Sequence, residues 1–154
     1  MAIAMTVLFD LRGALFTRRG KQTSSGKPRK FGGCWECGAG GKIEEGESAE
    51  QAARRELSEE LGVTDVRLRG LAEWSGANGL MYFLFVGVAR DKPHACDRQA
   101  ELSWREVRQA PLAGLRKQPL VPSFARAVTE LSKARVTTFT EALRFLQPPP
   151  TSTE

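Results

Sequence analysis

Residues 40–63 read GGKIEEGESAEQAARRELSEELGV, and this stretch decides the fold. Glycines gather at its start, and glycine permits φ > 0 and close approach of a ligand, so we predict a turn-rich loop there. A helix should follow, because Ser48 is a good N-cap, Gln51 completes a capping box, and Gly62 is a natural stop. The stretch therefore predicts a loop, a helix and a second loop.

Three carboxylates lie near the end of this predicted helix. Glu56, Glu59 and Glu60 have the spacing i, i+3 and i+4, which places them on one face. They repel each other, and negative charge at a helix C-terminus opposes the macrodipole. One interpretation is a solvated acidic helix end paired with Arg54 and Arg55. The other is a binding site for a hard divalent cation, which would neutralise the cluster.

The whole segment resembles the Nudix box, G-x5-E-x7-R-E-U-x-E-E-x-G-U, in which U is a bulky aliphatic residue. A chance match to this pattern is on the order of 10⁻⁸ per starting position. The resemblance implies an α/β fold, an α/β/α sandwich with a mixed β-sheet and a loop-helix-loop catalytic motif. All specified positions match, and they are Gly41, Glu47, Arg55, Glu56, Leu57, Glu59, Glu60, Gly62 and Val63.

The resemblance also implies residue roles and a reaction. Glu56 would bind a metal or act as a base through metal-bound water. Arg55 would orient Glu56, and Glu47 would brace the loop by pairing with Arg55. The usual family reaction is hydrolysis of a diphosphate linkage in a nucleotide or a nucleoside diphosphate conjugate. The implied ligands for Mg²⁺ or Mn²⁺ are the Gly40 carbonyl, Glu56, Glu59 and Glu60.

Substrate-binding candidates lie on both sides of the box. Nudix proteins open with a strand pair that ends in arginine, so Arg18 or Arg19 is expected near the substrate. Trp35 is a candidate for stacking on a base, although burial in the core is the favoured alternative. Tyr82 alternates with other aromatic residues along a predicted strand and faces either the core or the site.

A further acidic residue is expected near a tryptophan after the second strand pair. In this family such a residue serves as a metal ligand or a base. Glu101, shortly before Trp104, is our choice for this catalytic role, with Asp97 next. A solvated surface carboxylate is the alternative.

Length and composition bound the rest of the molecule. The 154 residues fit one domain over residues 1–147, followed by a flexible tail over residues 148–154. The net charge of +5 suits an anionic small-molecule substrate. Three cysteines, no apolar run of membrane-spanning length and no signal-peptide pattern favour a cytoplasmic protein.

Periodicity predicts the remaining elements. Strands are expected over residues 2–9, 14–17, 66–74 and 80–89, and helices over residues 124–134 and 140–146. Residues 18–30 form a basic segment without an acidic residue. This segment is either a mobile solvated loop or a basic lip for phosphates.

Several alternatives stay open at this point. A non-catalytic nucleotide- or RNA-binding regulator is one, although the intact acidic set counts against it, and RNA is not the favoured partner. An isopentenyl-diphosphate isomerase-like enzyme needs a histidine-rich metal site, and His94 is the single histidine. A zinc site from Cys34, Cys37, His94 and Cys96 is a minor alternative. A homodimer is common in the Nudix fold and stays an expectation.

Overall fold

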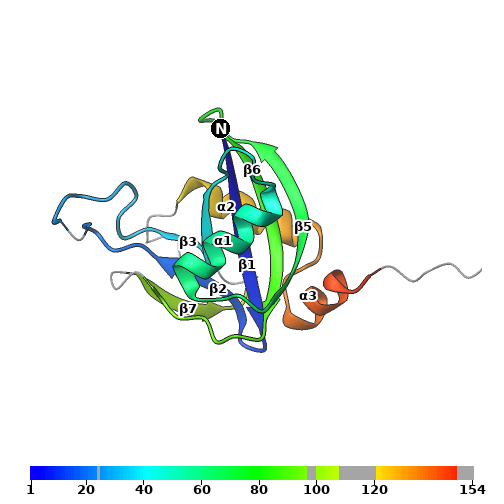
Figure 1. Cartoon of the computed structure of the whole chain (residues 1–154). Coiled ribbons are helices and arrows are strands. Elements are labelled where there is room, and N and C mark those ends of the chain that lie inside the picture. Colours follow the sequence, from blue (N-terminus) through cyan, green and yellow to red (C-terminus); the bar gives the residue numbers. More distant parts are fainter. Residues whose placement is uncertain (24, 97–99, 108–120, 149–154) are drawn as a thin grey trace, which may run out of the picture.

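The computed structural model describes residues 1–23, 25–96, 100–107 and 121–148 (Figure 1). None of the helices in this described part is long and apolar enough to cross a lipid bilayer. The strands are β1 (Ala2–Asp10), β2 (Gly13–Arg18), β3 (Trp35–Cys37), β4 (Ala39–Lys42), β5 (Val66–Ser75), β6 (Met81–Ala89) and β7 (Glu101–Arg105). The helices are α1 (Ala49–Leu61), α2 (Pro122–Lys133) and α3 (Phe139–Leu146).

Strand β1 is the centre of a mixed sheet. It runs parallel to β6 and antiparallel to β4, and β6 pairs antiparallel with β5. The last residues of β1 pair with β2, and β2 in turn pairs with β3 and β7. The sheet is therefore continuous from β5 to β3, and the two halves meet at the end of β1.

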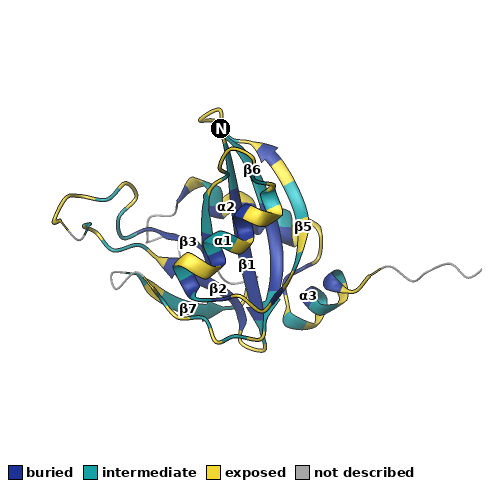
Figure 2. Ribbon diagram, viewed as in Figure 1, coloured by how far each residue is buried: buried dark blue, intermediate teal, exposed yellow. Residues whose placement is uncertain are grey.

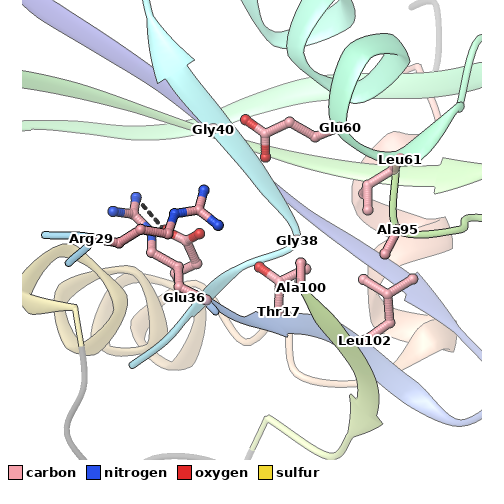
Figure 3. A pocket seen from close by; sticks show the side chains of 11 residues that line it. Thr17, Arg29, Glu36, Gly38, Gly40, Glu60, Leu61, Ala95, Ala100 and Leu102 are labelled. Carbon is pink, nitrogen blue, oxygen red and sulfur yellow. Dashed lines mark ion pairs between the residues drawn. The ribbon is translucent and has the colours of Figure 1, made fainter. Parts of the chain in front are cut away.

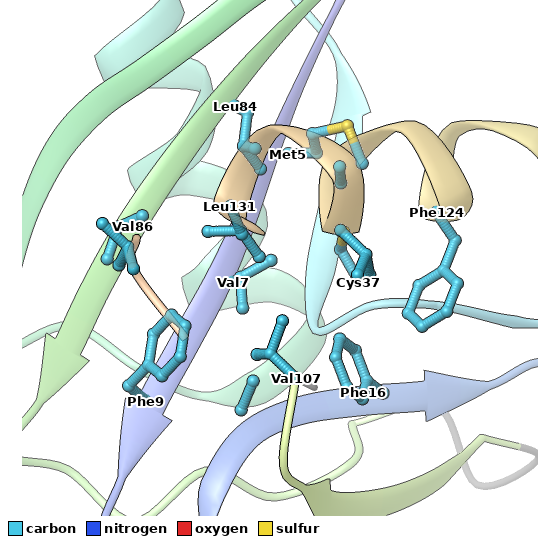
Figure 4. Packing of buried hydrophobic residues seen from close by; sticks show 14 of the residues in the cluster. Met5, Val7, Phe9, Phe16, Cys37, Leu84, Val86, Val107, Phe124 and Leu131 are labelled. Carbon is cyan, nitrogen blue, oxygen red and sulfur yellow. The ribbon is translucent and has the colours of Figure 1, made fainter. Parts of the chain in front are cut away.

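Alternation along β1 divides the molecule into two cores. Met5, Val7 and Phe9 pack toward α2, as Figure 4 shows. Leu8 packs with residues of α1, and Ala4 does so further along the strand. Successive side chains of a strand point to opposite faces, so β1 contributes to both cores and is buried along most of its length (Figure 2). Helix α1 thus covers one face and α2 with α3 the other, which confirms the predicted α/β/α sandwich.

Helix α1 begins and ends where the sequence predicts. The Ser48 hydroxyl accepts a hydrogen bond from the Gln51 amide at 3.1 Å, and the Gln51 side chain accepts one from the Ser48 amide at 2.8 Å. Gly62 takes the left-handed conformation, with φ 65°. The chain that follows β6 supplies further caps, because the amides of His94 and Cys96 bond to the last carbonyls of the helix at 3.0 Å each. This end of α1 is consequently held by both its own stop and a neighbouring loop.

The prediction of a turn-rich loop at Gly40 and Gly41 is wrong. Both glycines lie in β4, where they pair with β1. The bend comes earlier, at Gly38, where the chain passes from its pairing with β2 to its pairing with β1. A side chain at Gly38 would lie 3.2 Å from the Leu15 carbonyl oxygen, so glycine permits this close approach.

The other predicted strands and helices are present with small shifts at their ends. β1, β2, β5 and α3 include their whole predicted ranges, whereas β6 begins at Met81 and α2 ends at Lys133, each one residue short of the prediction. Thr138 caps α3, because its side chain accepts a hydrogen bond from the Glu141 amide. Most of the predicted tail, residues 149–154, lies outside the described residues.

The packing of α2 on the sheet makes a stability prediction. Leu131 is fully buried in the core between α2 and β1, whereas Leu11 is 88% exposed in the turn after β1. We expect Leu131→Ala to lower the free energy of unfolding by roughly 2–5 kcal/mol, because it removes buried methyl groups and leaves a cavity. Leu11→Ala is the matched control and should change it by less than about 0.5 kcal/mol. Urea unfolding of both variants makes the comparison, and equal losses would contradict this packing.

Candidate active site

Arg55 joins the two ends of the loop-helix segment. Its Nε and Nη2 atoms donate to the two carboxylate oxygens of Glu47 at 2.8 and 3.0 Å. Its Nη1 atom donates to Glu56 at 2.7 Å, and Nη2 also donates to the Lys42 carbonyl at 2.9 Å. A two-point contact with a carboxylate fixes the plane of the guanidinium group. Arg55 therefore connects β4, the loop after it and the helix through a single side chain.

Glu47 links the loop between β4 and α1 to Arg55. One of its carboxylate oxygens also accepts a hydrogen bond from the Glu44 amide at 3.0 Å. Arg55, followed by this amide, lowers the pKa of Glu47 to about 2, because both stabilise the charged form. The same pairing with Glu47 and Glu56 raises the pKa of Arg55 still further above its ordinary value. Both groups are thus charged across the ordinary pH range.

Gly41 makes room for Glu56. A Cβ atom at position 41 would overlap the Glu56 carboxyl group, so any larger residue would push that group away from the strand. Glu56 is itself largely shielded from solvent and is held by Arg55. The first glycine of the motif is thus required by contact with an acidic side chain, and a positive φ is not the reason.

Glu60 points from the last turn of α1 toward β4 (Figure 3). Burial raises its pKa to about 9, and hydrogen bonding and repulsion from Glu56, then repulsion from Glu36, act in the same direction. A hydrogen bond from the Gly40 backbone partly opposes this rise. The carboxyl groups of Glu56 and Glu60 are consequently in contact, and Glu36 adds repulsion from its place beside Arg19, so a positive charge next to Glu60 would be strongly favoured.

A cavity of about 280 Å³ opens in front of Glu60. Arg19 lies on its wall and pairs with Glu36 at 2.7 Å, and this contact raises the pKa of Arg19. The cavity thus has Glu60 on one side and, on the other, guanidinium groups together with Glu36. Its lining consists of Thr17, Arg19, Arg29, Glu36, Gly38, Gly40, Glu60, Leu61, Ala95, Ala100 and Leu102.

The donor set fits a hard divalent cation. Glu56 and Glu60 offer carboxylate oxygens within reach of each other, and their repulsion is what a cation would relieve. The amide of Gly40 faces Glu60, and in a β-strand the carbonyl of the same residue points to the same side. Glu59 lies farther out, with 60% of its side chain exposed and a 3.4 Å contact to Arg55. Within the described residues, no three acidic, cysteine or histidine side chains already form a closed metal cluster.

The predicted substrate residues divide into two groups. Arg19 and Tyr82 line cavities at the site, Arg19 in the cavity of Glu60 and Tyr82 in an adjoining one. Arg18 points elsewhere and pairs with Glu101. Trp35 is buried between the guanidinium groups of Arg18 and Arg105, at 5.6 and 4.8 Å from its ring centre. The structure therefore gives Trp35 a place in the core, where its ring cannot stack on a base.

Glu101 is likewise placed away from Glu60. It lies at the start of β7 with its side chain turned to Arg18, while its neighbours Ala100 and Leu102 line the cavity. Strand alternation explains this, because adjacent residues face opposite sides. Asp97, the second choice, lies outside the described residues.

Sequence reasoning missed Glu36 as a site residue. It lines the cavity, pairs with Arg19 and contributes to the raised pKa of Glu60. The signal was available, since Glu36 follows Trp35 directly before the glycines of the motif. What hid it was the strand break at Gly38, which brings β3 beside the cavity.

The zinc alternative finds no support in the described residues. Cys34 and Cys37 are buried, and Cys96 is exposed on the loop beside α1. Burial raises the pKa of the Cys37 thiol, which opposes the thiolate that zinc requires. Cys96 and His94 do lie 3.6 Å apart, but no third ligand joins them in that part of the chain.

Comparison with known proteins agrees with this geometry. A NUDIX domain model matches residues 1–128. An RNA pyrophosphohydrolase of Gluconobacter oxydans is 44% identical over 63 residues, which are 41% of this chain and 35% of that protein. The chain thus aligns with about a third of the length of this curated relative.

Solved structures share the fold at low identity. The DR0079 protein of Deinococcus radiodurans superposes with a TM-score of 0.70 at 19% identity, over 83% of this chain and 80% of that one. The NUDIX domain of Shewanella oneidensis NrtR, solved with ADP ribose, gives a TM-score of 0.63 at 21% identity, over 89% and 88%. Because the family model covers most of the chain, this protein belongs to the Nudix family.

The buried carboxyl of Glu60 makes a prediction for the metal-free protein. A folded-state pKa of about 9, above the ordinary value of 4.5, means that the folded state binds the extra proton between these two values. Stability should therefore fall as pH rises from about 5 to 9. Glu60→Gln should weaken this decline, whereas exposed Glu73→Gln should preserve it. Urea unfolding in chelator across this range is the measurement, and an unchanged slope in Glu60→Gln would contradict the environment described for Glu60.

Proposed function

We propose that this protein is a metal-dependent pyrophosphohydrolase that cleaves a diphosphate linkage in a nucleotide or a nucleoside diphosphate conjugate. The observation that carries the proposal is the contact of Glu60 with Glu56 at a cavity that Glu60 lines together with Arg19 and Arg29. Carboxylates suit a divalent cation, and guanidinium groups suit phosphate oxygens. Family membership supports the same reaction class.

Glu56, Glu60 and the Gly40 carbonyl would hold the metal, which is Mg²⁺ or Mn²⁺, with Glu59 as a further ligand. When bound, such a cation lowers the pKa of a coordinated water and offsets charge on phosphoryl oxygens. Arg55 keeps the Glu56 carboxylate beside Gly41, and Glu47 keeps Arg55 in its plane. Glu56 is the candidate for accepting a proton from the attacking water.

Arg19 and Arg29 are the groups that would receive the substrate phosphates. Arg19 spans the boundary between the cavity of Glu60 and the adjoining one, since it lines both. Its pairing with Glu36 fixes the guanidinium in place before any substrate arrives. Such prior ordering favours binding, because less side-chain freedom is lost.

A second candidate is a nucleotide-binding regulator without catalysis. The NrtR domain, solved with ADP ribose, shares this fold. The arrangement around Arg55 speaks against this alternative, because binding alone does not need two carboxyl groups in contact at one helix end, with an arginine holding one of them. A homodimer and a location in the cytoplasm remain proposals that rest on the sequence.

The central test is a substitution at Glu60. Glu60→Gln removes one carboxylate charge at nearly constant volume, so Mg²⁺-dependent hydrolysis should fall by at least about 100-fold while the fold is retained. The matched control is Glu50→Gln, an exposed residue in the first turn of the same helix. Phosphate release from nucleoside triphosphates, ADP-ribose, dinucleoside polyphosphates and 5′-triphosphorylated RNA makes the measurement, with circular dichroism as the check on folding.

Turnover that survives intact in Glu60→Gln would contradict the proposed mechanism. Absence of turnover on the whole panel, together with thermal stabilisation by ADP-ribose, would favour the binding regulator instead.

A further inference from the structure

The cleft continues beyond the cavity of Glu60 through two more compartments. An inner compartment of about 230 Å³ shares Arg19, Glu36 and Gly40 with that cavity. An outer compartment of about 420 Å³ shares Lys30, Phe31 and Tyr82 with the inner one. A substrate held at Glu60 could therefore extend outward past Tyr82 along a single path.

Phe31 stands on this path in an unusual conformation. Its φ of 56° lies in the left-handed region, which bulky residues rarely adopt, and the residue is 39% exposed. Hydrogen bonds of 3.0 Å from Gly32 to Arg29 and from Cys34 to Phe31 fix the surrounding turn. Strained residues of this kind tend to occur at binding sites, and here the fold places an aromatic ring in the wall of both compartments.

A second aromatic group forms another part of the wall. Tyr82 stacks on Trp74 with ring centres 5.7 Å apart and planes 15° apart. The Asn78 side chain donates a hydrogen bond to the Tyr82 hydroxyl at 2.9 Å. Arg126 lies over the Trp74 ring at 5.2 Å, which holds the stack from the side of α2. The aromatic platform is thus rigid before a ligand binds.

The charge around this platform is positive. Lys30 and Arg126 line the outer compartment, and none of the described residues that line it is acidic. Arg126 also pairs with Glu130 at 2.8 Å, which offsets its charge, so Lys30 contributes most of the net positive charge in this compartment. Lys30 belongs to a basic arm, residues 19–23 and 25–31, which projects from the body of the molecule (Figure 1). Aromatic faces beside cationic groups are the chemistry that recognises single-stranded nucleic acid.

We propose that the outer compartment binds the second nucleotide of a single-stranded oligonucleotide with a phosphorylated 5′ end. Its base would stack at Phe31 and Tyr82, and the phosphate that joins it to the first nucleotide would face Lys30. The first nucleoside would occupy the inner compartment. This inference rests on the proposed function, which places the 5′ phosphates beside Glu60.

The test measures binding without turnover. A tetranucleotide with a 5′ monophosphate and a 3′ fluorescein is followed by fluorescence anisotropy, and unlabelled competitors displace it. A 5′-phosphorylated dinucleotide should compete roughly 5- to 100-fold better than the nucleoside 5′-monophosphate, because one further base is stacked. Ribose and deoxyribose versions of each competitor distinguish RNA from DNA.

Variants locate the effect. Phe31→Ala and Phe31→Leu should each remove most of the dinucleotide advantage, since leucine keeps the apolar character and loses the ring. Lys30→Ala should reduce it and weaken its dependence on salt. Lys27→Ala is the matched control, because Lys27 is exposed on the same arm and lines neither compartment, so the advantage should persist.

Equal competition by mononucleotide and dinucleotide would overturn the inference, as would failure of the tetranucleotide to bind. An advantage that survives Phe31→Ala and Lys30→Ala would also overturn it. If nucleoside triphosphates are hydrolysed but the advantage is missing, only this inference fails. If the advantage is present and no substrate is hydrolysed, the proposed function fails and the binding site stands.

Discussion

The pairing of Arg55 with Glu47 and Glu56 is the interaction on which the site depends. Glu56 and Glu60 crowd together at the end of a helix, where the macrodipole disfavours negative charge. Arg55 offsets part of that charge from within the same helix and fixes the position of Glu56. Glu47 holds the other edge of the guanidinium, so the loop and the helix move as one unit. A lysine could supply the positive charge, but it could not hydrogen-bond to Glu47 and Glu56 with two edges of one planar group.

The fold places this unit against a strand that has no side chain at the critical position. Gly41 in β4 meets Glu56, and Gly40 meets Glu60 through its backbone. Strand β4 is fixed by its pairing with β1, and β1 is fixed by the two cores on its faces. The position of the site thus depends on a strand that is buried along most of its length.

Features that depend on contacts between residues close in the chain could be predicted from the sequence alone. Ser48 with Gln51, and Gly62 at the opposite end, set the limits of α1 through contacts within a few residues. The contacts of Glu101 and Trp35 could not be predicted in this way. Glu101 turns to Arg18 because of its register in β7, and Trp35 is enclosed by arginines from two different strands. Register across a sheet depends on distant partners, which a single sequence does not reveal.

Strand β4 was also mispredicted because its structure depends on a distant partner. Its residues are alanine, two glycines and lysine, a composition typical of a turn, and only the pairing with β1 makes it a strand. Glu36 was missed for the same reason, because β3 reaches the cavity through a bend at Gly38.

The most direct test of this account is a titration of Mn²⁺ into the protein by calorimetry, comparing Arg55→Lys with Arg54→Lys. Both substitutions keep the positive charge, but only Arg55 donates directly to Glu56 while Glu47 holds it, whereas Arg54 contacts the Val66 carbonyl. Loss of an orienting contact to a metal ligand typically weakens binding by about 10- to 100-fold. We predict a loss of this size in Arg55→Lys and wild-type affinity in Arg54→Lys. Wild-type Mn²⁺ affinity in Arg55→Lys would contradict the central role assigned to Arg55.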